Sequence, residues 1–198
     1  MVAIYFFICH RYLRMDRMAS HQPIFIDITW GAAGSTKELT MAISDYAQKY
    51  FGVEVLMHLT CSGLTVAELK KILNEARSAG IHNILALRGD PPKGAQFWEP
   101  VPDGLVHAID LVRLIRQEHG DYFGIAVAGF PEGHPHTRHD SDSDIRYLKE
   151  KIDCGADFIL SQFFYDTNVF IDFVKKCRSS GIKCPIIPGT ISFGSYAT

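Results

Sequence analysis

A regular alternation between short apolar runs and longer helical patterns, from Ile24 onward, is the feature that most constrains the fold. The apolar runs are rich in β-branched and aromatic residues, as expected for strands that are buried on both faces. The predicted strands are Ile24–Thr29, Val53–Leu59, Asn83–Leu87, Phe123–Ala128, Phe158–Phe163 and Pro185–Ile187. Six strands with five intervening helices predict one α/β unit with a parallel sheet.

Between the runs, apolar residues recur at the spacing of one helix face. Two such sets are Val66, Leu69, Ile72, Leu73 and Ala76, and Leu105, Ala108, Ile109, Val112 and Ile115. Capping boxes are predicted at Ser35–Glu38 and Thr65–Glu68, with a weaker one at Ser141–Asp144. Gly80, Gly120 and Gly181 are predicted to end helices as left-handed C′ residues.

Composition excludes several classes of protein. The 198 residues are 47% apolar and carry a net charge of −2, so disorder is excluded and no nucleic-acid partner is expected. The apolar run Val2–Cys9 is too short to cross a bilayer, and arginines follow it, the reverse of a signal peptide. Five scattered cysteines without a C-x-x-C pair indicate a reducing compartment, and we expect a cytoplasmic protein without a membrane partner.

Two architectures fit the alternation, a doubly wound sheet and a (β/α)8 TIM barrel. Gly31–Ser35 lacks the spacing of a dinucleotide-binding glycine motif, and no phosphate-binding P-loop sequence occurs. The barrel is therefore favoured. Because such barrels run to about 250 residues, 198 residues predict an incomplete barrel of about six βα units.

Polar residues gather where the predicted strands end, the side of a parallel barrel that carries chemistry. They are Thr29-Trp30, His58 to Cys61, Arg88-Gly89-Asp90, Gly129 to His134, and Gln162 with Tyr165-Asp166. The opposite ends are expected to lack such groups. The repetition over five strands predicts one shared site.

Each of these residues also has a structural interpretation. His58 is either a half-buried, hydrogen-bonded side chain or a ligand contact. Arg88 and Asp90 form either a salt bridge across Gly89 or a cation and carboxylate beside a bare amide, and the second is favoured. Gln162 is interpreted as a buried amide that needs a partner. Cys61 and Cys154 are expected to pack as small hydrophobic residues.

His134, His136, His139 and Asp140 resemble a metal cluster. They lie on a polar loop that contains Pro135, whereas metal-binding histidines are usually held by a rigid element. We therefore predict no metal site. A metal-dependent barrel hydrolase that uses His58 and this cluster is the least favoured function.

Six motifs, in order, resemble the methylenetetrahydrofolate reductase family. They are Ile26–Gly31, His58–Cys61, Ala86–Pro92, Val127–Pro135, Lys151–Asp157 and Gln162–Asp166, and the similarity runs from about Asp16 to Gly189. The resemblance implies a flavin-dependent barrel that reduces 5,10-methylenetetrahydrofolate to 5-methyltetrahydrofolate with NADH or NADPH. It divides the chain into an atypical segment, residues 1–15, and a partial catalytic barrel, residues 16–198.

The resemblance also implies roles for individual residues. The FAD-contacting positions are Thr29, His58, Arg88, Gly89, Asp90, Ala108, Phe130, His134, Asp144 and Lys151. Asp90 is expected beside the flavin and the folate as the catalytic carboxylate, and Gln162 at the folate and nicotinamide site. Two ligands that use one site in turn imply ping-pong kinetics.

Several departures from the family accompany these matches. Phe130 replaces a more usual Tyr, and the loop from His136 to Ser143 is short. No Glu-Phe-Phe-Pro-Pro strand, which carries the family's general acid, precedes Asp16, and Thr190–Phe193 differs from the usual sequence. We therefore expect the chain to lack the first and the last two strands and to fail folate turnover alone. The alternative is a non-catalytic isoform that binds flavin, forms a homo-oligomer or pairs with full-length subunits.

Overall fold

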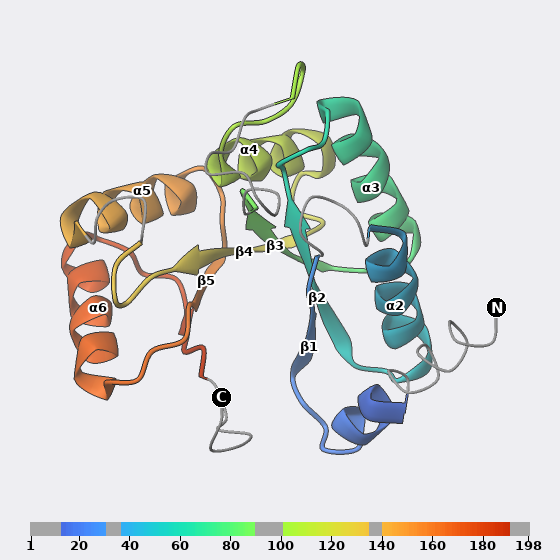
Figure 1. Cartoon of the computed structure of the whole chain (residues 1–198), viewed down its shortest axis with the longest axis horizontal. Coiled ribbons are helices and arrows are strands. Elements are labelled where there is room, and N and C mark those ends of the chain that lie inside the picture. Colours follow the sequence, from blue (N-terminus) through green and yellow to red (C-terminus); the bar gives the residue numbers. More distant parts are fainter. Residues whose placement is uncertain (1–12, 31–36, 90–100, 135–139, 191–198) are drawn as a thin grey trace, which may run out of the picture.

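The computed structural model describes residues 13–30, 37–89, 101–134 and 140–190, which form one sheet of six parallel strands. The strand order follows the sequence, and each strand pairs in parallel with the next (Figure 1). The strands are β1 (Phe25–Ile28), β2 (Glu54–Thr60), β3 (Asn83–Leu87), β4 (Gly124–Gly129), β5 (Phe158–Ser161) and β6 (Ile186–Ile187). The predicted parallel sheet is confirmed.

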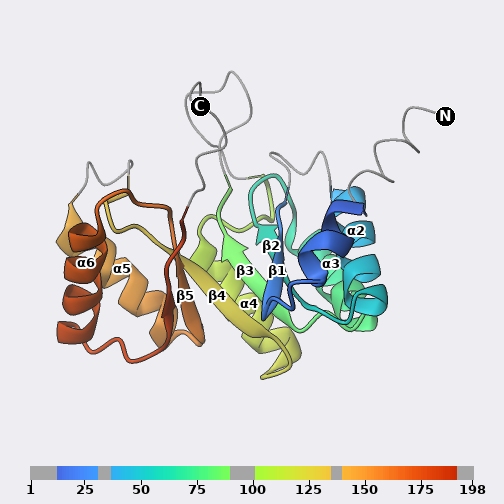
Figure 2. The same cartoon turned by 90° about the horizontal axis from the view of Figure 1, so that it is seen from below.

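Five helices connect the strands and lie on the outer side of the curled sheet (Figures 1 and 2). They are α2 (Lys37–Tyr50), α3 (Val66–Ser78), α4 (Ala108–His119), α5 (Ser141–Asp153) and α6 (Thr167–Ser179). Residues 13–19, before β1, are also helical. A parallel sheet that curls inside a layer of helices is an incomplete (β/α)8 barrel, as the sequence predicts.

The two faces of the sheet differ in what they bury. The large core lies between the outer face and the helices, and it contains Val55, Met57 and Leu59 of β2. The inner face carries a smaller apolar cluster built on Leu56, Leu85 and Ala126. Because side chains alternate along a strand, residues in register with this smaller cluster point toward the concave side.

The predicted strands match the observed ones closely, and β3 matches at both ends. The largest difference is β5, which ends at Ser161 and not at Phe163. The backbone N–H of Gln162 donates to the carbonyl of Gly129 (2.7 Å), and beyond this bond the side chain of Phe163 is 38% exposed. An apolar side chain that lies outside the core gives no reason for the strand to continue.

The capping box of α3 is confirmed and that of α5 is corrected. The N–H of Thr65 donates to Glu68 Oε2 (2.9 Å), and the N–H of Glu68 donates to Thr65 Oγ1 (3.3 Å). The predicted box at Ser35 lies outside the described residues. Helix α5 is capped by Asp140, whose carboxylate accepts from the N–H groups of Asp142 and Ser143, and not by Ser141. The anionic Asp140 also suits the positive end of the helix dipole.

Two of the three predicted C′ glycines are confirmed. Gly80 (φ +75°) and Gly181 (φ +82°) each follow the C-cap residue of a helix in a left-handed conformation. Gly120 is itself the C-cap of α4, with φ +56° and ψ −128°, so the prediction of a left-handed C′ residue is wrong there.

The apolar faces of the helices are confirmed for α3 and only in part for α4. Leu69, Ile72, Leu73 and Ala76 are buried in α3, as predicted. In α4 the buried apolar residues include Leu111 and Leu114 beside the predicted Val112 and Ile115, because this helix packs a wider face on the sheet.

The amino ends of the strands carry a polar network, which corrects the expectation that polar groups occur at one edge only. Arg116 of α4 donates to the carbonyls of Gly155 (2.8 Å) and Phe123 (2.8 Å) and pairs with Asp157 (2.5 Å). Asp157 Oδ2 also accepts from the N–H of Ile125 (2.7 Å). These bonds satisfy backbone groups where β4 and β5 begin, which is a structural role.

Candidate functional site

The carboxyl ends of β1 to β5 place the predicted site residues along one edge of the sheet. Thr29 directly follows β1, His58 lies near the end of β2, and Arg88 directly follows β3. Phe130 and Gln162 directly follow β4 and β5. The fold therefore brings residues that are more than 130 positions apart to a single edge, as a parallel barrel requires.

Pairing between β2 and β3 continues past the strands and fixes the backbone of Arg88. The N–H of Cys61 donates to the carbonyl of Leu87 (3.0 Å), and the N–H of Ser62 donates to the carbonyl of Arg88 (2.8 Å). Arg88 is half-buried, and it forms no ion pair with any carboxylate of the described residues. A guanidinium on a fixed backbone, unpaired among the described residues, is suited to an anionic ligand.

Gly89 makes a close backbone approach that no other residue type allows. Its φ is +99°, and a Cβ at this position would lie 2.1 Å from Ser62 Oγ and 3.1 Å from Thr60 Cβ. The bare backbone therefore packs on the end of β2, and Arg88 is held beside it.

Buried polar atoms without hydrogen-bond partners cluster around this point. Within the described residues they include Thr60 Oγ1, Ser62 Oγ and His58 Nε2. All three belong to the end of β2 or the residues that follow it. Trp30 Nε1 is also unpaired, but its ring packs in the outer core. Since buried polar groups are normally satisfied, this concentration marks a place where a polar ligand would supply partners.

A second group of site residues links the loop after β4 to α5. The rings of Phe130 and His134 stack edge to face, with their centroids 4.4 Å apart. The N–H of His134 donates to Asp144 Oδ2 (2.8 Å), which ties the loop to the first turn of α5. Asp144 and Lys151 are seven residues apart, so both lie on the face of α5 that also carries the buried Leu148.

Lys151 is largely shielded from solvent on α5. Burial lowers the pKa of its amine to about 8, and the nearby Asp144 carboxylate offsets only part of that effect. Burying a charged amine costs free energy unless an anion lies close to it, so an anionic ligand next to Lys151 would stabilise its charged form. Lys151 lies in the last turn of α5 and Asp144 in its first, and a contact of Lys151 with a phosphorylated ligand stays a prediction.

Gln162 differs from its sequence-based interpretation. The structure places it just beyond β5 with an exposed side chain, so the interpretation as a buried amide is wrong. Its backbone is nevertheless fixed, by its own N–H bond to Gly129 and by Ser161 Oγ, which donates to the Gln162 carbonyl (3.0 Å). Its role as a ligand contact stays a prediction.

Other predicted residues are placed as follows. Thr29 is exposed, and its carbonyl accepts from Thr40 Oγ1 (3.1 Å). Ala108 begins α4. Asp166 caps α6 by accepting from the N–H of Asn168 (2.8 Å), which gives it a structural role. Asp90, His136 and His139 lie outside the described residues.

The cysteines behave as expected for buried thiols. Cys61 is fully buried in the core, and burial raises the pKa of its thiol to about 11, so it is neutral and unreactive near pH 7. Cys154 is half-buried and packs against the same core. The four cysteines within the described residues are free thiols.

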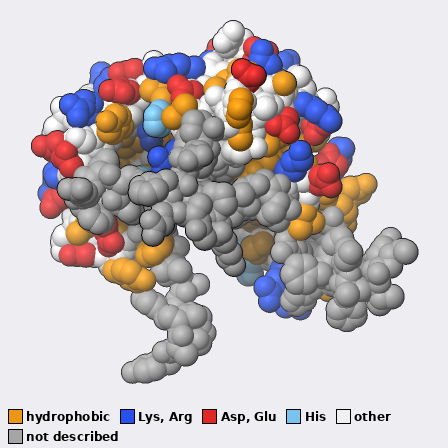
Figure 3. Space-filling model, turned by 45° about the horizontal axis from the view of Figure 1, so that its top comes forward, with side chains coloured by type: hydrophobic (Ala, Val, Ile, Leu, Met, Phe, Trp, Pro, Cys, Tyr) orange, Lys and Arg blue, Asp and Glu red, His pale blue; other side chains and the backbone are white. Residues whose placement is uncertain are grey.

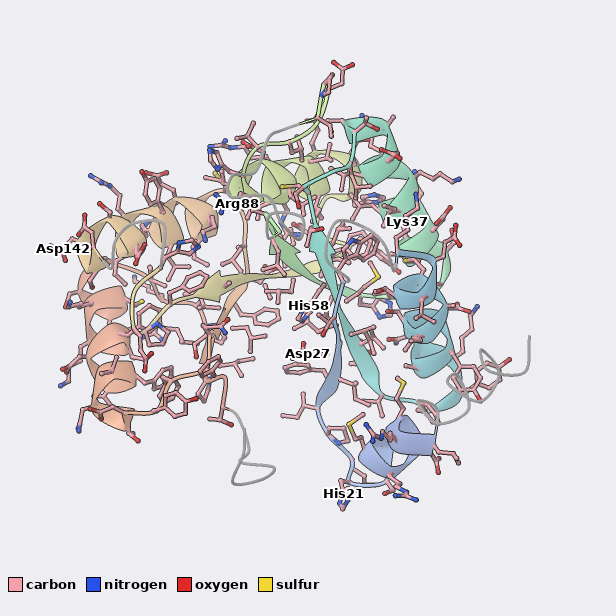
Figure 4. The ribbon with its side chains drawn as sticks, viewed as in Figure 1. His21, Asp27, Lys37, His58, Arg88 and Asp142 are labelled. Atoms are coloured by element: carbon pink, nitrogen blue, oxygen red, sulfur yellow. The ribbon has the colours of Figure 1, made fainter. Side chains whose placement is uncertain are left out.

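Three residues that sequence reasoning did not single out support the site: Asp27, Ser62 and Ser161. Asp27 lies between Ile26 and Ile28, and both isoleucines belong to the outer core. This alternation places Asp27 on the inner face beside His58 (Figure 4). A lone carboxylate within an apolar strand was the signal that could have found it.

The outer surface is distinct from this edge. Two shallow grooves lie between α2 and α3 and between α5 and α6, on the far side of the helices from the inner face. On the face shown in Figure 3, acidic and basic side chains are interspersed. No helix within the described ranges is long and apolar enough to cross a membrane.

These features define a parallel α/β barrel protein whose carboxyl edge presents the half-buried Arg88 and unpaired buried polar groups. The family model described as methylenetetrahydrofolate reductase matches residues 10–198. The chain belongs to the methylenetetrahydrofolate reductase family.

Similar relatives come from plants, fungi and bacteria. Methylenetetrahydrofolate reductase (NADH) 1 of Arabidopsis thaliana is 49% identical over 191 residues, which cover 92% of this chain and 32% of that protein. Methylenetetrahydrofolate reductase 2 of Saccharomyces cerevisiae is 45% identical, over 94% of this chain and 32% of its own length. The Escherichia coli 5,10-methylenetetrahydrofolate reductase is 36% identical, over 92% of this chain and 58% of that protein. The chain thus spans about a third of the plant and yeast relatives that it matches.

Solved structures agree on the fold. A phosphonopyruvate hydrolase in complex with oxalate and Mg²⁺ superposes with a TM-score of 0.64 at 10% identity, covering 90% of this chain and 72% of that one. A 2,3-dimethylmalate lyase superposes with a TM-score of 0.57 at 11% identity, covering 89% of this chain and 71% of that one. At these identities the likeness shows the fold alone.

Proposed function

We propose that this chain forms part of a flavoprotein site that reduces 5,10-methylenetetrahydrofolate to 5-methyltetrahydrofolate, with FAD as cofactor and NADH or NADPH as reductant. The observation that carries the proposal is the pair Arg88 and Gly89, held by Cys61 and Ser62 at the carboxyl edge beside orphaned polar atoms. The chain's family provides the reaction class.

The residues present fit FAD. Its pyrophosphate needs cations, for which we propose Arg88 at this edge and the desolvated Lys151 on α5. Its polar groups need hydrogen-bond partners, for which Thr60 and Ser62 have unpaired buried hydroxyls and His58 a second ring nitrogen. Gly89 is a further proposed contact, through its backbone, because Ser62 fills the position of its missing Cβ. Thr29, Ala108, Phe130, His134, Asp144 and Asp90 complete the proposed set of FAD contacts.

The division of roles follows from the chemistry of each group. Bound FAD would supply reversible hydride acceptance and donation. Arg88 and Lys151 neutralise phosphate charge, and Asp144 fixes the loop that carries His134. Gln162, exposed at the end of β5, offers an amide to whichever substrate occupies the site. Asp90 is proposed to act as the fixed carboxylate near the folate.

The two substrates are proposed to use the site in turn. Relatives named for NADH occur in plants, and one named for NADPH occurs in Caenorhabditis elegans, so both reductants belong in the test. A cytoplasmic location is part of the proposal, because free thiols occur throughout the described chain.

The test is an anaerobic NAD(P)H oxidation assay on the purified chain loaded with FAD. Menadione serves first as the electron acceptor, and 5,10-methylenetetrahydrofolate then replaces it. Flavin-dependent oxidation with menadione supports the proposal of a flavin site, and parallel lines in double-reciprocal plots support alternate use of one site. NAD(P)H oxidation that occurs with menadione but not with 5,10-methylenetetrahydrofolate assigns the chain to flavin binding without folate turnover. Stoichiometric metal without flavin in the purified chain would favour the hydrolase and overturn the proposal.

A further inference from the structure

Asp27 and His58 form a pair on the concave face of the sheet. Asp27 of β1 is in register with Leu56 of β2, and His58 lies two residues further along the same face. Figure 4 shows the two side chains next to each other on adjacent strands, with Arg88 at the end of β3. Leu56 and Leu85, which is in register with His58, belong to the inner apolar cluster.

The geometry of the pair places a carboxylate against a buried ring nitrogen. Asp27 Oδ1 lies 3.5 Å from His58 Nε2, and the side chains are 40% and 16% exposed. Nε2 is buried and has no hydrogen bond within the described residues. Asp27 is also the only carboxylate of the described ranges within ion-pair distance of His58. The separation is slightly long for a hydrogen bond, as is common for active-site pairs before a ligand binds.

A carboxylate at this position selects one form of the imidazole. It accepts a hydrogen bond from a protonated Nε2, and it repels the lone pair of an unprotonated one. With the proton on Nε2, the neutral ring presents Nδ1 as its acceptor. The orientation of the ring is then set by β1, a neighbouring strand, and not by the ligand.

We propose that Asp27 is a positioning residue for His58, which fixes the proton on Nε2 and leaves Nδ1 to meet a donor of the bound ligand. The inference rests on the proposed function only for the identity of that ligand, FAD. The tautomer is a property of the protein alone. Its test therefore has one arm that needs no cofactor.

The first arm is ¹⁵N NMR of the histidine rings in the full chain without cofactor, at a pH where the spectra show neutral rings. His58 is assigned by its loss in His58→Phe. The wild type is expected to show Nε2 protonated, and Asp27→Asn is expected to shift His58 toward the other tautomer. Asp45→Asn removes a carboxylate that pairs with Lys49 on the outer helix α2, and it should leave the signal unchanged. An unchanged His58 tautomer in Asp27→Asn overturns the proposal.

The second arm is a double-mutant cycle on FAD affinity. Asp27→Asn alone is expected to weaken FAD binding about two- to tenfold, the scale of one hydrogen bond. In a His58→Phe background the same substitution should have no further effect, because Asp27 acts through His58. Equal effects in both backgrounds overturn the proposal. Asp27→Ser serves in place of Asp27→Asn where the latter lowers the melting temperature.

Failure of the two proposals can be told apart. A wild-type chain that binds no FAD contradicts the proposed function, and the NMR arm still decides the relationship between Asp27 and His58. A chain that binds FAD but shows no change of tautomer in Asp27→Asn keeps the proposed function and removes the inference.

Discussion

A Cβ placed on Gly89 would lie 2.1 Å from Ser62 Oγ, so the end of β3 and the end of β2 are in closer contact than any residue with a side chain allows. The contact holds Arg88 at the edge where the ligand is proposed to bind. It also makes Gly89 a position where even a methyl group is expected to destabilise the fold.

Gly89→Ala is expected to destabilise the fold by about 2–4 kcal/mol, because it combines a positive φ with a steric clash. Gly63→Ala is the matched control, since Gly63 has φ +74° and open space around its missing side chain. Gly63→Ala should cost only about 1 kcal/mol. Urea unfolding of both variants measures the difference, and equal losses would show that the contact with Ser62 carries no energy.

Lys151→Met is expected to stabilise the ligand-free chain and to weaken FAD binding. Burial lowers the pKa of Lys151 to about 8 from 10.5, so the folded state disfavours the charged amine. The unfolded state therefore binds more protons between these pH values, and stability on this account rises as the pH increases from 8 to 10.5. Near pH 7 the substitution removes the penalty, for a gain of about 1–3 kcal/mol.

The measurements are thermal unfolding without ligand and FAD titration at pH 7. The expected loss of FAD affinity is about tenfold or more, the scale of a charge-assisted contact. Lys149→Met is the control. It removes an amine of α5 that lies two residues before Lys151 and pairs with Asp153, and it should change neither quantity strongly. A Lys151→Met chain that is less stable and binds FAD normally would refute the proposed role.

Much of the fold follows from the sequence, because its strands are buried on both faces and its helices carry continuous apolar faces. Asn83–Leu87 is bounded by polar residues and Gly, and it is predicted to the residue. The strand β5 is predicted to extend to Phe163 because this residue is apolar, although in the structure it lies beyond the end of the strand and is exposed. The spacing from Ser141 to Asp144 predicts a cap at Ser141, but Asp140, directly before it, also caps well and is the residue that caps α5.

The candidate site is predicted in part. The polar residues that end successive strands point to the correct edge, since parallel strands share one direction. The burial of Lys151 and the exposure of Gln162 depend on how α5 and the end of β5 pack, which sequence spacing does not encode. The pairing of Asp27 with His58 depends on the register between β1 and β2, which only the folded sheet defines.

Ser161→Ala is expected to raise the Kd for the folate while leaving FAD affinity unchanged. Ser161 Oγ accepts from the N–H of Gly189 (2.9 Å) and donates to the carbonyl of Gln162 (3.0 Å), so it fixes the backbone that carries Gln162. An increase of about two- to tenfold corresponds to the loss of one such bond. Titration of the FAD-loaded protein with the folate, followed by flavin absorbance, measures the change, and Ser161→Thr, which keeps the hydroxyl, should restore the Kd. Loss of FAD together with folate affinity would instead indicate general unfolding of the edge.

The fold is expected to lose stability below about pH 6.5 through His119. Burial, and secondarily the Arg77 guanidinium, lower the pKa of His119, whose ring nitrogens have no hydrogen-bond partner in the described chain. Protons therefore bind the unfolded state more readily in this range, so stability falls as the pH decreases through the ordinary histidine pKa. His119→Leu should flatten the pH dependence of urea unfolding between pH 7 and 5, whereas His21→Gln, at an exposed position, should not. A parallel pH dependence in the wild type and His119→Leu would exclude His119 as the cause.

The central claim, that the carboxyl edge binds a flavin through Arg88, is tested most directly by titrating the purified chain with FAD and following quenching of flavin fluorescence. The account predicts saturable one-to-one binding that Arg88→Ala weakens about tenfold or more. The matched substitution Arg113→Ala, at an exposed arginine of α4 that pairs with Asp110, should leave the affinity unchanged. An absence of saturable binding, or equal affinity in the wild type and Arg88→Ala, would contradict the account.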